Sequence, residues 1–583
     1  MQLDHTRSTV APPRVIPADT TTIFYPANAA YHIHYRHAET PYTDFNIQPL
    51  LPHKFSQNGP GIAVGAINGD GRDDFFVGGA YNHSGQLFFQ QANGTFISGA
   101  LVTGKKYEED MGALFFDADN DGDPDLYVVS GGNEFAAGSP YYQDRLYIND
   151  GKGSFTLARD ALPEMYSSGS CVIAADFDKD GDLDLFVGGR LTPQHYPAAG
   201  VSLLLENRNG IFVDVTDEKA PGLKHIGMVT AALWTDVNDD NYIDLLMVGE
   251  WMPVTMFINH NGTFSNATEQ AGLLHTVGWW NSIQAADFNQ DGRTDYILGN
   301  LGLNSRFRTS EKDPLKMYAS GYGNPGAMDA IISYSLNGTS YPVHPRDDVM
   351  QRMPFLKKQF PLYKDYAHAK MEDLFPPEVL SKAGPVTAHT FQTAYLHHNG
   401  TQGWKLEPLC VEAQFAPVFG MLAGDYDADG FADILLTGNW YATEVVSGQY
   451  DAFKGLFLKG NGEGGFSVKE NGFRLEGDAK GLTEIRTKKN TLLLLSAMNN
   501  DSLVALEHRP RITPPPLAVV APDDAYAIIK LNNGKQVKQE WYYGSGYFSQ
   551  TGRYLRIPGN AVSVTVYNFK GEQREWDLPA SSK

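Results

Sequence analysis

The stretch Asp117-Ala-Asp-Asn-Asp-Gly-Asp-Pro-Asp125, followed at once by Leu-Tyr-Val-Val-Ser-Gly-Gly132, decides the fold because it recurs along the chain. Similar nine-residue acidic loops begin at positions 176, 236, 287 and 425, and each precedes an apolar run that contains glycine. A weaker copy covers residues 66–74, and a residual copy covers residues 321–329. Recurrence of one short unit is the signature of a repeat architecture.

Each repeat is large enough for a small antiparallel sheet. After most loops come two further strand-like segments joined by an Asn/Gly turn, such as residues 145–158. About four strands over ~50 residues is the size of one propeller blade, and such sheets bury their faces only by packing around an axis. Seven units are expected, beginning near the following residues: Gly61, Met111, Gly169, Met228, Trp280, Pro417 and Lys480.

These units predict an all-β fold, a seven-bladed β-propeller with a helical insertion and a small C-terminal β domain. The insertion, at about 312–388, contains an expected hairpin (315–341) and a charged, helical stretch (346–383). If the hairpin starts its own blade, the propeller has eight blades. The last unit is short of a strand, which residues 31–37 can supply and so close the ring.

The expected domains follow from these boundaries. Residues 1–54 form an N-terminal segment that partly closes the ring, and residues 55–510 form the propeller. Residues 511–522 are rich in proline and predict a stiff linker, and residues 523–583 form the small β domain. Residues 1–19 are polar and unlike a signal peptide, so we expect the sequence to be a piece of a longer, exported chain.

Composition narrows the classes of partner. The chain has 583 residues, with 46 Lys and Arg against 68 Asp and Glu, a net charge of −22. Such a polyanion repels nucleic acid and anionic membranes, and no apolar run reaches the ~18 residues of a transmembrane helix. The two cysteines, Cys171 and Cys410, form no CxxC motif, and we expect them to be buried free thiols.

The acidic loops have the spacing of calcium ligands. Oxygen-bearing side chains occupy positions 1, 3, 5 and 9, and Ca²⁺ takes six to eight oxygen ligands. Glycine, usual at position 6, permits the sharp turn, and the backbone carbonyl of position 7 adds a ligand. The expected ligands, position 7 included, are Asp117, Asp119, Asp121, Asp123 and Asp125; Asp176, Asp178, Asp180, Asp182 and Asp184; Asp236, Asn238, Asp240, Tyr242 and Asp244; Asp287, Asn289, Asp291, Arg293 and Asp295; and Asp425, Asp427, Asp429, Phe431 and Asp433.

Two further observations refine the expected calcium sites. An EF-hand requires Glu at position 12, whereas these loops have the apolar residues Val128, Val187, Met247, Leu298 and Leu436 there. The loop at 66 lacks a first carboxylate and offers the doubtful ligands Asn68, Asp70, Arg72 and Asp74, and the loop at 321 keeps only Asp329. We therefore expect about five bound Ca²⁺ ions, one doubtful site and one empty site.

These loops and strands resemble the FG-GAP/VCBS repeats of integrin-α-like propellers, over roughly residues 55–510. The segments "LLPHKFSQNGPGIAVGAINGDG", "SGGNEF" and "YYGSGYFSQTGRYLRI" are similar to bacterial proteins that join such a propeller to an ASPIC/UnbV-type domain. The resemblance implies export, often as a surface lipoprotein of Bacteroidetes. It also implies that the loops join the first two strands of each blade and that ligands bind the opposite face.

Chemistry beyond calcium is sparse in the sequence. It contains no GxSxG, Walker A or HExxH motif. His32 and His34 form an HxH pattern, which is more often a solvent-facing strand than a metal site. On the rim opposite the loops, aromatic residues suit stacking on sugars or anchoring a protein. The candidates for ligand binding are Trp251, Trp279, Trp280, Trp440, Tyr441, Tyr141 and Tyr142.

Two classes of function fit these observations. The first is a non-enzymatic calcium-binding propeller at the cell surface or outside the cell, which binds a glycan or protein partner, mediates adhesion or scaffolds a surface complex in the outer membrane. The second is a carbohydrate-active enzyme resembling a polysaccharide lyase on a calcium-bearing propeller. A lyase needs a base and a charge-neutralising group in one site, and no such group of residues can be assembled from the sequence. We therefore expect binding and no catalytic residues.

Overall fold

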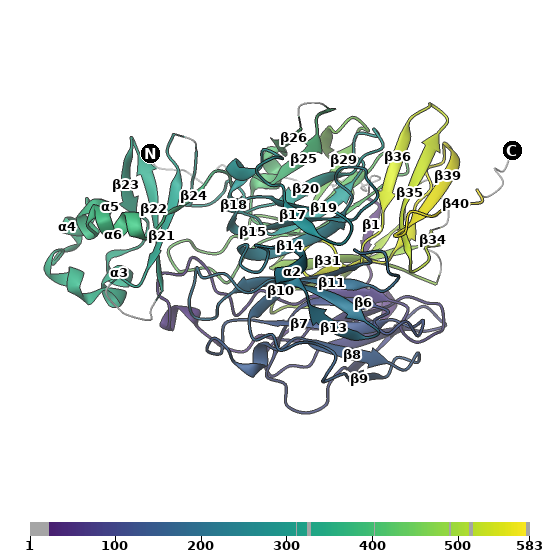
Figure 1. The fold of residues 1–583 in the computed structure, drawn as a ribbon, viewed down its shortest axis with the longest axis horizontal. Helices are drawn as coiled ribbons and strands as arrows, with labels where there is room; N and C mark the ends of the chain where they lie inside the picture. The colour runs from purple at the N-terminus through teal and green to yellow at the C-terminus, as the bar shows by residue number, and fades with distance from the viewer. Residues whose placement is uncertain are drawn as a thin grey trace, which may run out of the picture.

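The computed structural model describes residues 22–310, 312–322, 328–400, 403–488, 491–511 and 517–578. Nearly all regular structure in these residues is β, in small antiparallel sheets, and the helices are short. This confirms the all-β class. Figure 1 shows a central body of sheets, with one small lobe projecting from its side and the C-terminal strands packed on the body elsewhere.

Seven sheets in the described part of the chain form the central body, and each runs outward strand by strand. Their strands, innermost first, are β2 (Ile62–Gly65), β3 (Asp74–Val77), β4 (Gln86–Gln90) and β5 (Phe96–Ala100); β6 (Glu109–Phe116), β7 (Asp125–Gly131), β8 (Arg145–Asn149) and β9 (Phe155–Leu157); β10 (Ser168–Ala175), β11 (Asp184–Leu191), β12 (Leu203–Arg208) and β13 (Ile211–Asp214); β14 (Met228–Thr235), β15 (Asp244–Met252), β16 (Thr255–Asn259) and β17 (Phe264–Asn266); β19 (Ser282–Ala286), β20 (Asp295–Gly299), β25 (Ala394–His398) and β26 (Trp404–Pro408); β27 (Val418–Gly424), β28 (Asp433–Gly438), β29 (Leu456–Gly460) and β30 (Phe466–Val468); and β31 (Ala479–Arg486), β32 (Leu492–Met498), β33 (Val504–His508) and β1 (Phe24–Pro26).

The innermost strands lie next to one another in chain order. Strand β2 contacts β6, and the series continues through β10, β14, β19 and β27 to β31, which in turn contacts β2. The first and last sheets are also joined by a hydrogen bond from Gln90 Nε2 to the Arg486 carbonyl, 3.1 Å long. The buried strands therefore surround a common centre.

The outermost strand of the last sheet comes from the N-terminal segment, but not from the residues expected. Strand β1 pairs with β33, whereas residues 31–37 contribute only the isolated bridge of Arg36 with Ser502. The reason is local: Tyr31 ends the short helix α1 (Asn28–Tyr31), and His32 adopts the left-handed φ of 57°. An extended strand cannot pass through that conformation.

The projecting lobe lies between β20 and β25, where an insertion was expected. Its sheet has the order β23-β22-β21-β24, and short helices cover it around a separate core that includes Met350 and Leu374. The elements are β21 (Leu315–Ser320), β22 (Asp329–Leu336), β23 (Thr339–Pro342), α3 (Arg346–Arg352), η5 (Pro354–Lys358), α4 (Tyr363–Tyr366), α5 (Met371–Leu374), α6 (Pro377–Lys382) and β24 (Val386–Ala388).

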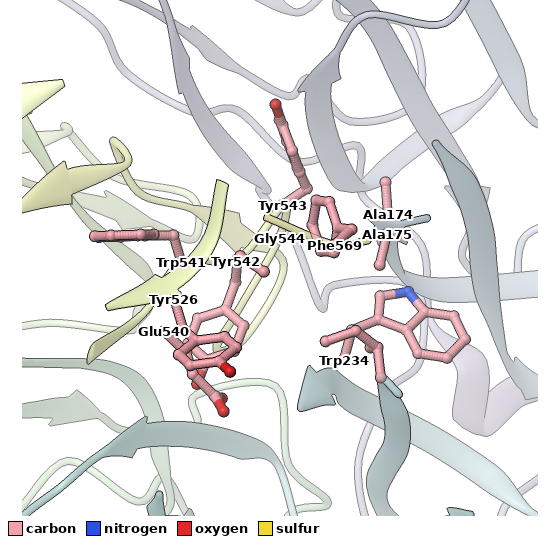
Figure 2. A pocket seen from close by; sticks show the side chains of 12 residues that line it. Ala174, Ala175, Trp234, Tyr526, Glu540, Trp541, Tyr542, Tyr543, Gly544 and Phe569 are labelled. Carbon is pink, nitrogen blue, oxygen red and sulfur yellow. The ribbon is translucent and has the colours of Figure 1, made fainter. Parts of the chain in front are cut away.

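The C-terminal residues form a second sheet domain that packs on the loop end of the body. Its sheet has the order β36-β35-β39-β40, with the strands β35 (Asp524–Leu531), β36 (Gln536–Glu540), β39 (Ala561–Asn568) and β40 (Gln573–Glu575). Figure 2 shows Phe569 next to Ala174 and Ala175 of the body, in a pocket that Tyr542, Tyr543 and Trp234 also line. The Ala174 amide donates a 2.9 Å hydrogen bond to the Tyr543 carbonyl.

The proline-rich linker is shorter than residues 511–522, the range expected from the sequence. Strand β34 (Ala518–Val519) pairs with β38 (Tyr554–Leu555), so residues 518 and 519 belong to the C-terminal domain. Residues 512–516, which contain three consecutive prolines, lie outside the described residues.

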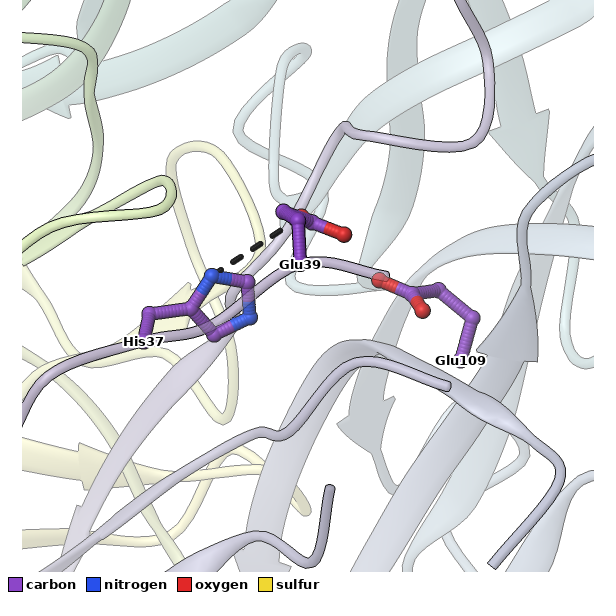
Figure 3. A group of neighbouring side chains, drawn as sticks. All are labelled: His37, Glu39 and Glu109. Atoms are coloured by element: carbon purple, nitrogen blue, oxygen red, sulfur yellow. Dashed lines mark ion pairs between the residues drawn. The ribbon is translucent and has the colours of Figure 1, made fainter. Parts of the chain in front are cut away.

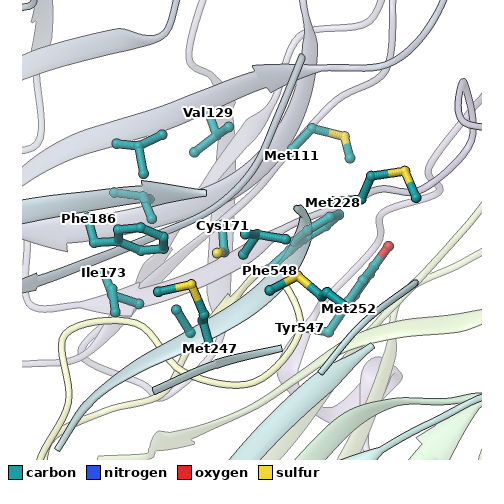
Figure 4. Close-up of a cluster of buried hydrophobic side chains, with 14 of the residues drawn as sticks. Met111, Val129, Cys171, Ile173, Phe186, Met228, Met247, Met252, Tyr547 and Phe548 are labelled. Atoms are coloured by element: carbon teal, nitrogen blue, oxygen red, sulfur yellow. The ribbon is translucent and has the colours of Figure 1, made fainter. Parts of the chain in front are cut away.

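A segment of the C-terminal domain enters the centre of the ring of innermost strands. Within residues 544–552, β37 (Ser549–Gln550) pairs in parallel with β2, and the Gln550 side chain bonds to both the N–H and the carbonyl of Phe115 at 2.7 Å. Tyr547 and Phe548 lie in the same buried cluster as Met111 and Cys171 (Figure 4). We call residues 544–552 the central plug. Cys171 is thus a buried free thiol, and Cys410 is free and partly exposed.

The N-terminal segment covers the opposite end of the body. Asp44 accepts a 2.7 Å hydrogen bond from Asn133, the Lys54 amide donates to the Ala442 carbonyl, and His53 Nε2 lies 3.1 Å from Glu250. The centre is thus filled by the plug and covered by the N-terminal segment, so it does not form an open channel through these residues.

Candidate metal centres

The acidic loops join the first strand of a sheet to the second, as the resemblance implied. They share one backbone form in which positions 4 and 6 both have positive φ. Position 4 holds Gly69, Asn120, Lys179, Asp239, Gln290 and Ala428, and position 6 holds Gly71, Gly122, Gly181, Asn241, Gly292 and Gly430. The glycine at position 6 was expected, whereas the strained position 4 has no consistent residue type to reveal it.

The aspartate at position 9 ties strands together. Asp125 is fully buried, and its carboxylate accepts hydrogen bonds from the Asn149 and Ala118 amides at 2.8 and 2.9 Å. The Asn149 side chain donates in turn to the Ile67 carbonyl in the preceding loop. The same relay links Asp184, Asn207 and Ala118, and Asp244, Asn259 and Phe177. The loops at 117, 176 and 236 are therefore each coupled to the preceding loop.

Three loops gather carboxylates into one space. Each places the aspartates of positions 1, 3 and 9 so that one oxygen of each lies within 4.8 Å of the others. The groups are Asp117, Asp119 and Asp125; Asp176, Asp178 and Asp184; and Asp425, Asp427 and Asp433. Buried oxygens without a hydrogen-bond partner remain on Asp117, Asp176, Asp178 and Asp427. Unpaired, buried carboxylate oxygens in a compact group fit a hard cation such as Ca²⁺.

The electrostatics of these groups favour a bound cation. Burial, and then repulsion from neighbouring aspartates, raises the pKa of Asp184 to about 9 against hydrogen bonding from Asn207. Burial likewise raises the pKa of Asp125 to about 7 and that of Asp433 to about 8. A cation replaces the proton that such carboxyl groups otherwise retain.

The loops at 236 and 287 are built differently at position 3. Asn238 and Asn289 donate to the carboxylates of Asp240 and Asp291 at 2.9 and 3.1 Å, and no three of these loops' described carboxylates converge as in the other three loops. The C-terminal domain contacts both loops: the Lys538 amide donates to Asp287 at 3.1 Å, and its ammonium lies 3.7 Å from Asp239.

Lysines also approach two of the convergent groups. Lys459 Nζ contacts Asp427 and lies 2.6 Å from Asp429, and Lys219 Nζ lies 3.0 Å from Asp178. These ammonium groups partly neutralise the loops at 425 and 176. The loop at 117 has no such lysine pair among the described residues, so its carboxylates depend most on a cation.

The two weaker copies are occupied by internal cations. In the loop at 66, the Arg72 guanidinium pairs with Asp70, and Ala66 supplies no carboxylate. In the residual copy, Arg352 pairs with Asp329, and residues 323–327 lie outside the described part of the chain. Both loops thus offer less to Ca²⁺ than the other five.

Most of the aromatic candidates for ligand binding are buried in the packing of the body and do not form an exposed surface. Trp251, Trp279, Trp280, Trp440 and Tyr142 are buried, with at most 6% of each residue exposed. Trp251 donates to the Tyr196 hydroxyl, and Trp440 packs on the His53 ring at a centroid distance of 3.8 Å. His53 of the N-terminal segment packs on Trp440 and Trp279, which the sequence pattern did not indicate. Tyr141 is partly exposed and Tyr441 is 37% exposed.

A buried ionic group underlies this covered surface. Glu250 accepts hydrogen bonds from Arg190, Tyr196 and His53. Burial raises its pKa, but His53 and Arg190 outweigh burial and lower it to about 2. Glu250 is therefore ionised and fixes the N-terminal segment on the body.

One cavity of the body has a volume of about 400 Å³. It lies between the second and third sheets and is lined by residues that include Glu164, Tyr166, Thr192, Asp214 and Lys224. A smaller cavity of about 150 Å³, between the C-terminal domain and the body, includes Glu484, Lys538 and Arg556. Arg556 pairs with Glu484, and Lys538 pairs with Glu540 at 2.9 Å.

Comparison with known proteins supports the acidic repeat found in the sequence. FG-GAP-like repeats match residues 67–128, 131–187 and 236–298, so the chain contains at least three such repeats. Cartilage acidic protein 1 of Mus musculus is 29% identical over 218 residues, which cover 36% of this chain and 32% of the mouse protein. The Homo sapiens protein is 27% identical over 218 residues, 36% of this chain and 31% of the human protein. The match thus spans about a third of the length of these relatives.

Similar solved structures are distant. BBS1N in complex with ARL6DN has a TM-score of 0.37 at 10% identity and covers 79% of this chain and 95% of its own. The V. cholerae biofilm matrix protein Bap1 has a TM-score of 0.31 at 12% identity and covers 90% and 99%. A rhamnogalacturonan lyase of Bacillus licheniformis has a TM-score of 0.30 at 10% identity and covers 92% and 77%. Within the described residues, no helix has the length and hydropathy needed to cross a bilayer.

Proposed function

We propose that this protein is a calcium-stabilised, seven-bladed propeller that acts outside the cytoplasm as a binding or scaffolding module. One observation carries the calcium assignment: the loops at 117, 176 and 425 each bring three carboxylates together and leave buried oxygens unpaired. The loops at 236 and 287 are the two further sites, completed in part by amide and carbonyl oxygens. The ring of seven innermost strands supports seven blades and closure.

The position of the loops gives calcium a structural role. The position 9 aspartates tie neighbouring sheets together, and the C-terminal domain contacts the loops at 176, 236 and 287 through Lys570, Tyr526 and Lys538. Ion binding therefore stabilises both the ring and the docking of the C-terminal domain. The FG-GAP-like repeats, the similarity to cartilage acidic protein 1 and the acidic surface support an extracellular site of action.

The surface available for a partner is the 400 Å³ cavity of the second and third sheets. Its volume lies within the roughly 300–1,000 Å³ of ligand pockets, and Tyr166 is 38% exposed at its edge beside Glu164 and Lys224. An aromatic ring with polar neighbours suits a sugar. We therefore propose a glycan or glycoprotein partner at this cavity.

The alternative, a polysaccharide lyase, has a weaker basis. Its best candidate is the cavity with Lys538 and Arg556, which lies beside the loops at 287 and 425. That cavity is smaller than typical ligand pockets, and its charged groups are paired. Incubation with acidic polysaccharides separates the two proposals, because a lyase generates unsaturated ends that absorb ultraviolet light.

Chelation tests the calcium assignment. Excess EDTA removes the ions, and the melting temperature is expected to fall sharply because Ca²⁺ bound only by the folded state stabilises it by mass action. Asp121→Ala should lose one ion and still fold, with Asp160→Ala, an exposed aspartate outside the loops, as the matched control. An unchanged melting curve after verified removal of calcium would contradict the proposal.

A further inference from the structure

A second group of candidate metal ligands lies at the end of the body opposite the acidic loops. Strand β6 begins at Glu109 and leads to the loop at 117, so Glu109 marks the opposite end of that sheet. His37 and Glu39 reach it from the N-terminal segment. Figure 3 shows the Glu109 carboxylate pointing toward the imidazole of His37, with Glu39 beside the ring.

The three side chains form a compact and buried group. His37 Nδ1 lies 3.8 Å from Glu39 Oε1, and one ligand atom from each residue lies within 4.8 Å of the other two. The side chains of His37 and Glu39 are 1% and 3% exposed, and Glu109 is 2% exposed. A metal ion with bonds of about 2.0–2.2 Å bridges atoms at such separations after small side-chain rotations.

Two buried polar atoms of this group have no partner. They are His37 Nε2 and Glu109 Oε1. Two carboxylate oxygens are oriented from outside: Asn499 donates to Glu39 at 2.7 Å, and the Tyr81 amide donates to Glu109 Oε2 at 2.6 Å. The Asn500 amide donates to His37 Nδ1 at 3.2 Å, and a metal ion bound at that nitrogen, the one near Glu39, replaces this contact. Native proteins rarely leave such atoms unpaired, so the group lacks a component.

Among the described residues, neither Glu39 nor Glu109 forms an ion pair with a lysine or arginine. The Lys106 ammonium donates instead to the carbonyls of Gly79 and Glu108 and pairs with Asp110 at 3.0 Å. Glu134 adds a further buried carboxylate close by. Excess buried negative charge is costly without a counterion.

We propose that His37, Glu39 and Glu109 bind one divalent transition-metal ion of the Zn²⁺ type. An imidazole nitrogen with two carboxylates is a ligand set that Zn²⁺ accepts, whereas Ca²⁺ prefers oxygen ligands alone. The ion joins the N-terminal segment to the second sheet. Its site is separate from the acidic loops in position and in chemistry.

The sequence favoured solvent-facing side chains for His32 and His34 and gave no signal for His37. His32 and His34 are both exposed, and His37 is the buried one, two residues before Glu39. The partner Glu109 comes from a distant strand, so spacing alone does not reveal the site.

Elemental analysis of the full chain tests the proposal. Protein purified in excess Ca²⁺ is incubated with Zn²⁺ alone, separated from free metal by gel filtration and analysed by inductively coupled plasma mass spectrometry. Wild type is expected to retain about one Zn²⁺ more per chain than Glu109→Gln and His37→Gln. His32→Gln, in the same segment but exposed, is the matched control and should retain the full amount. The calcium content should be equal in all four proteins.

If Glu109→Gln or His37→Gln does not fold, two further measurements still test the proposal. Glu39→Gln removes another ligand, and X-ray absorption at the zinc edge of the wild type should show oxygen and nitrogen neighbours that include one imidazole. Equal zinc content in wild type and Glu109→Gln, or no zinc retained by folded wild type, would overturn the proposal. Because calcium is counted in the same sample, these outcomes are distinct from a failure of the loop assignment.

Discussion

Ala428 has an unfavourable backbone conformation for its residue type. It occupies position 4 of the loop at 425 with φ of 62°, a region that costs a non-glycine residue roughly 1–2 kcal/mol. Ala428→Gly relieves this strain, but glycine also loses more conformational entropy on folding, which offsets part of the gain. The free energy of unfolding should therefore rise by about 0.5–1 kcal/mol. Gly430→Ala, at φ of 91°, is the matched opposite change. Urea denaturation in Ca²⁺ measures both, and a loss of stability in Ala428→Gly would contradict this account.

His344 links stability to pH in the insertion. Burial, and next Arg306, lowers its pKa from 6.5 to about 3, and its Nε2 accepts a 3.0 Å hydrogen bond from the Ile332 amide. Because the folded-state pKa is depressed, the stability contributed by the neutral ring is present above pH 6.5 and is lost as the pH falls toward 3. The loss is about 1.4 kcal/mol for each pH unit below 6.5.

The comparison with His344→Gln isolates this effect, because glutamine keeps an acceptor and does not titrate. Urea denaturation at pH 7 and pH 5 should show a smaller drop for the variant than for the wild type. Parallel losses in the two proteins would assign the acid sensitivity to other groups.

Among the elements, the central plug has the most specific contacts. Gln550 bonds to both the N–H and the carbonyl of Phe115, as a neighbouring strand would. Gln550→Ala leaves two buried backbone groups unpaired, at about 1–3 kcal/mol each, so a loss of about 2–6 kcal/mol is expected. Gln536→Ala, at an exposed site of β36, should change stability by less than about 0.5 kcal/mol. Thermal unfolding of the two variants checks this, and equal effects would contradict it.

The buried tryptophans opposite the acidic loops are expected to stabilise the fold rather than to bind a ligand. Trp251 is 6% exposed, and its ring packs against Trp279 at a centroid distance of 5.4 Å. Trp251→Ala should therefore destabilise the fold by about 3–5 kcal/mol, whereas Tyr441→Ala, at a more exposed site, should have a small effect. Chemical denaturation measures both; a Trp251→Ala protein with unchanged stability and lost glycan binding would instead restore the binding role.

The elements that sequence could predict are those with a repeated local pattern. The acidic loops, the strands after them and the glycine at position 6 follow from spacing and turn chemistry, and the β class and the FG-GAP-like repeats are confirmed. The plug carries no such local signal, since its role depends on Phe115, 435 residues away. For the same reason, neither the cover over Trp440 nor the proximity of His37 and Glu109 could be inferred from neighbouring residues.

At the scale of the whole molecule, both ends of the ring are covered by the chain's own termini. The C-terminal domain lies on the loops and inserts the plug, and the N-terminal segment covers the other end. This arrangement leaves the sides of the ring and the projecting insertion for partners. It also makes the loops a junction, because the innermost strands and the C-terminal domain meet there.

The central claim is that the acidic loops bind calcium, and the most direct test is to count the ions. Elemental analysis of the full chain, purified in Ca²⁺ and freed of unbound metal, should give about five calcium ions per molecule, with the loops at 117, 176 and 425 the last to lose theirs as free Ca²⁺ is lowered. Fewer than three ions in folded protein would contradict the assignment, because even the three convergent carboxylate groups would then not all be occupied.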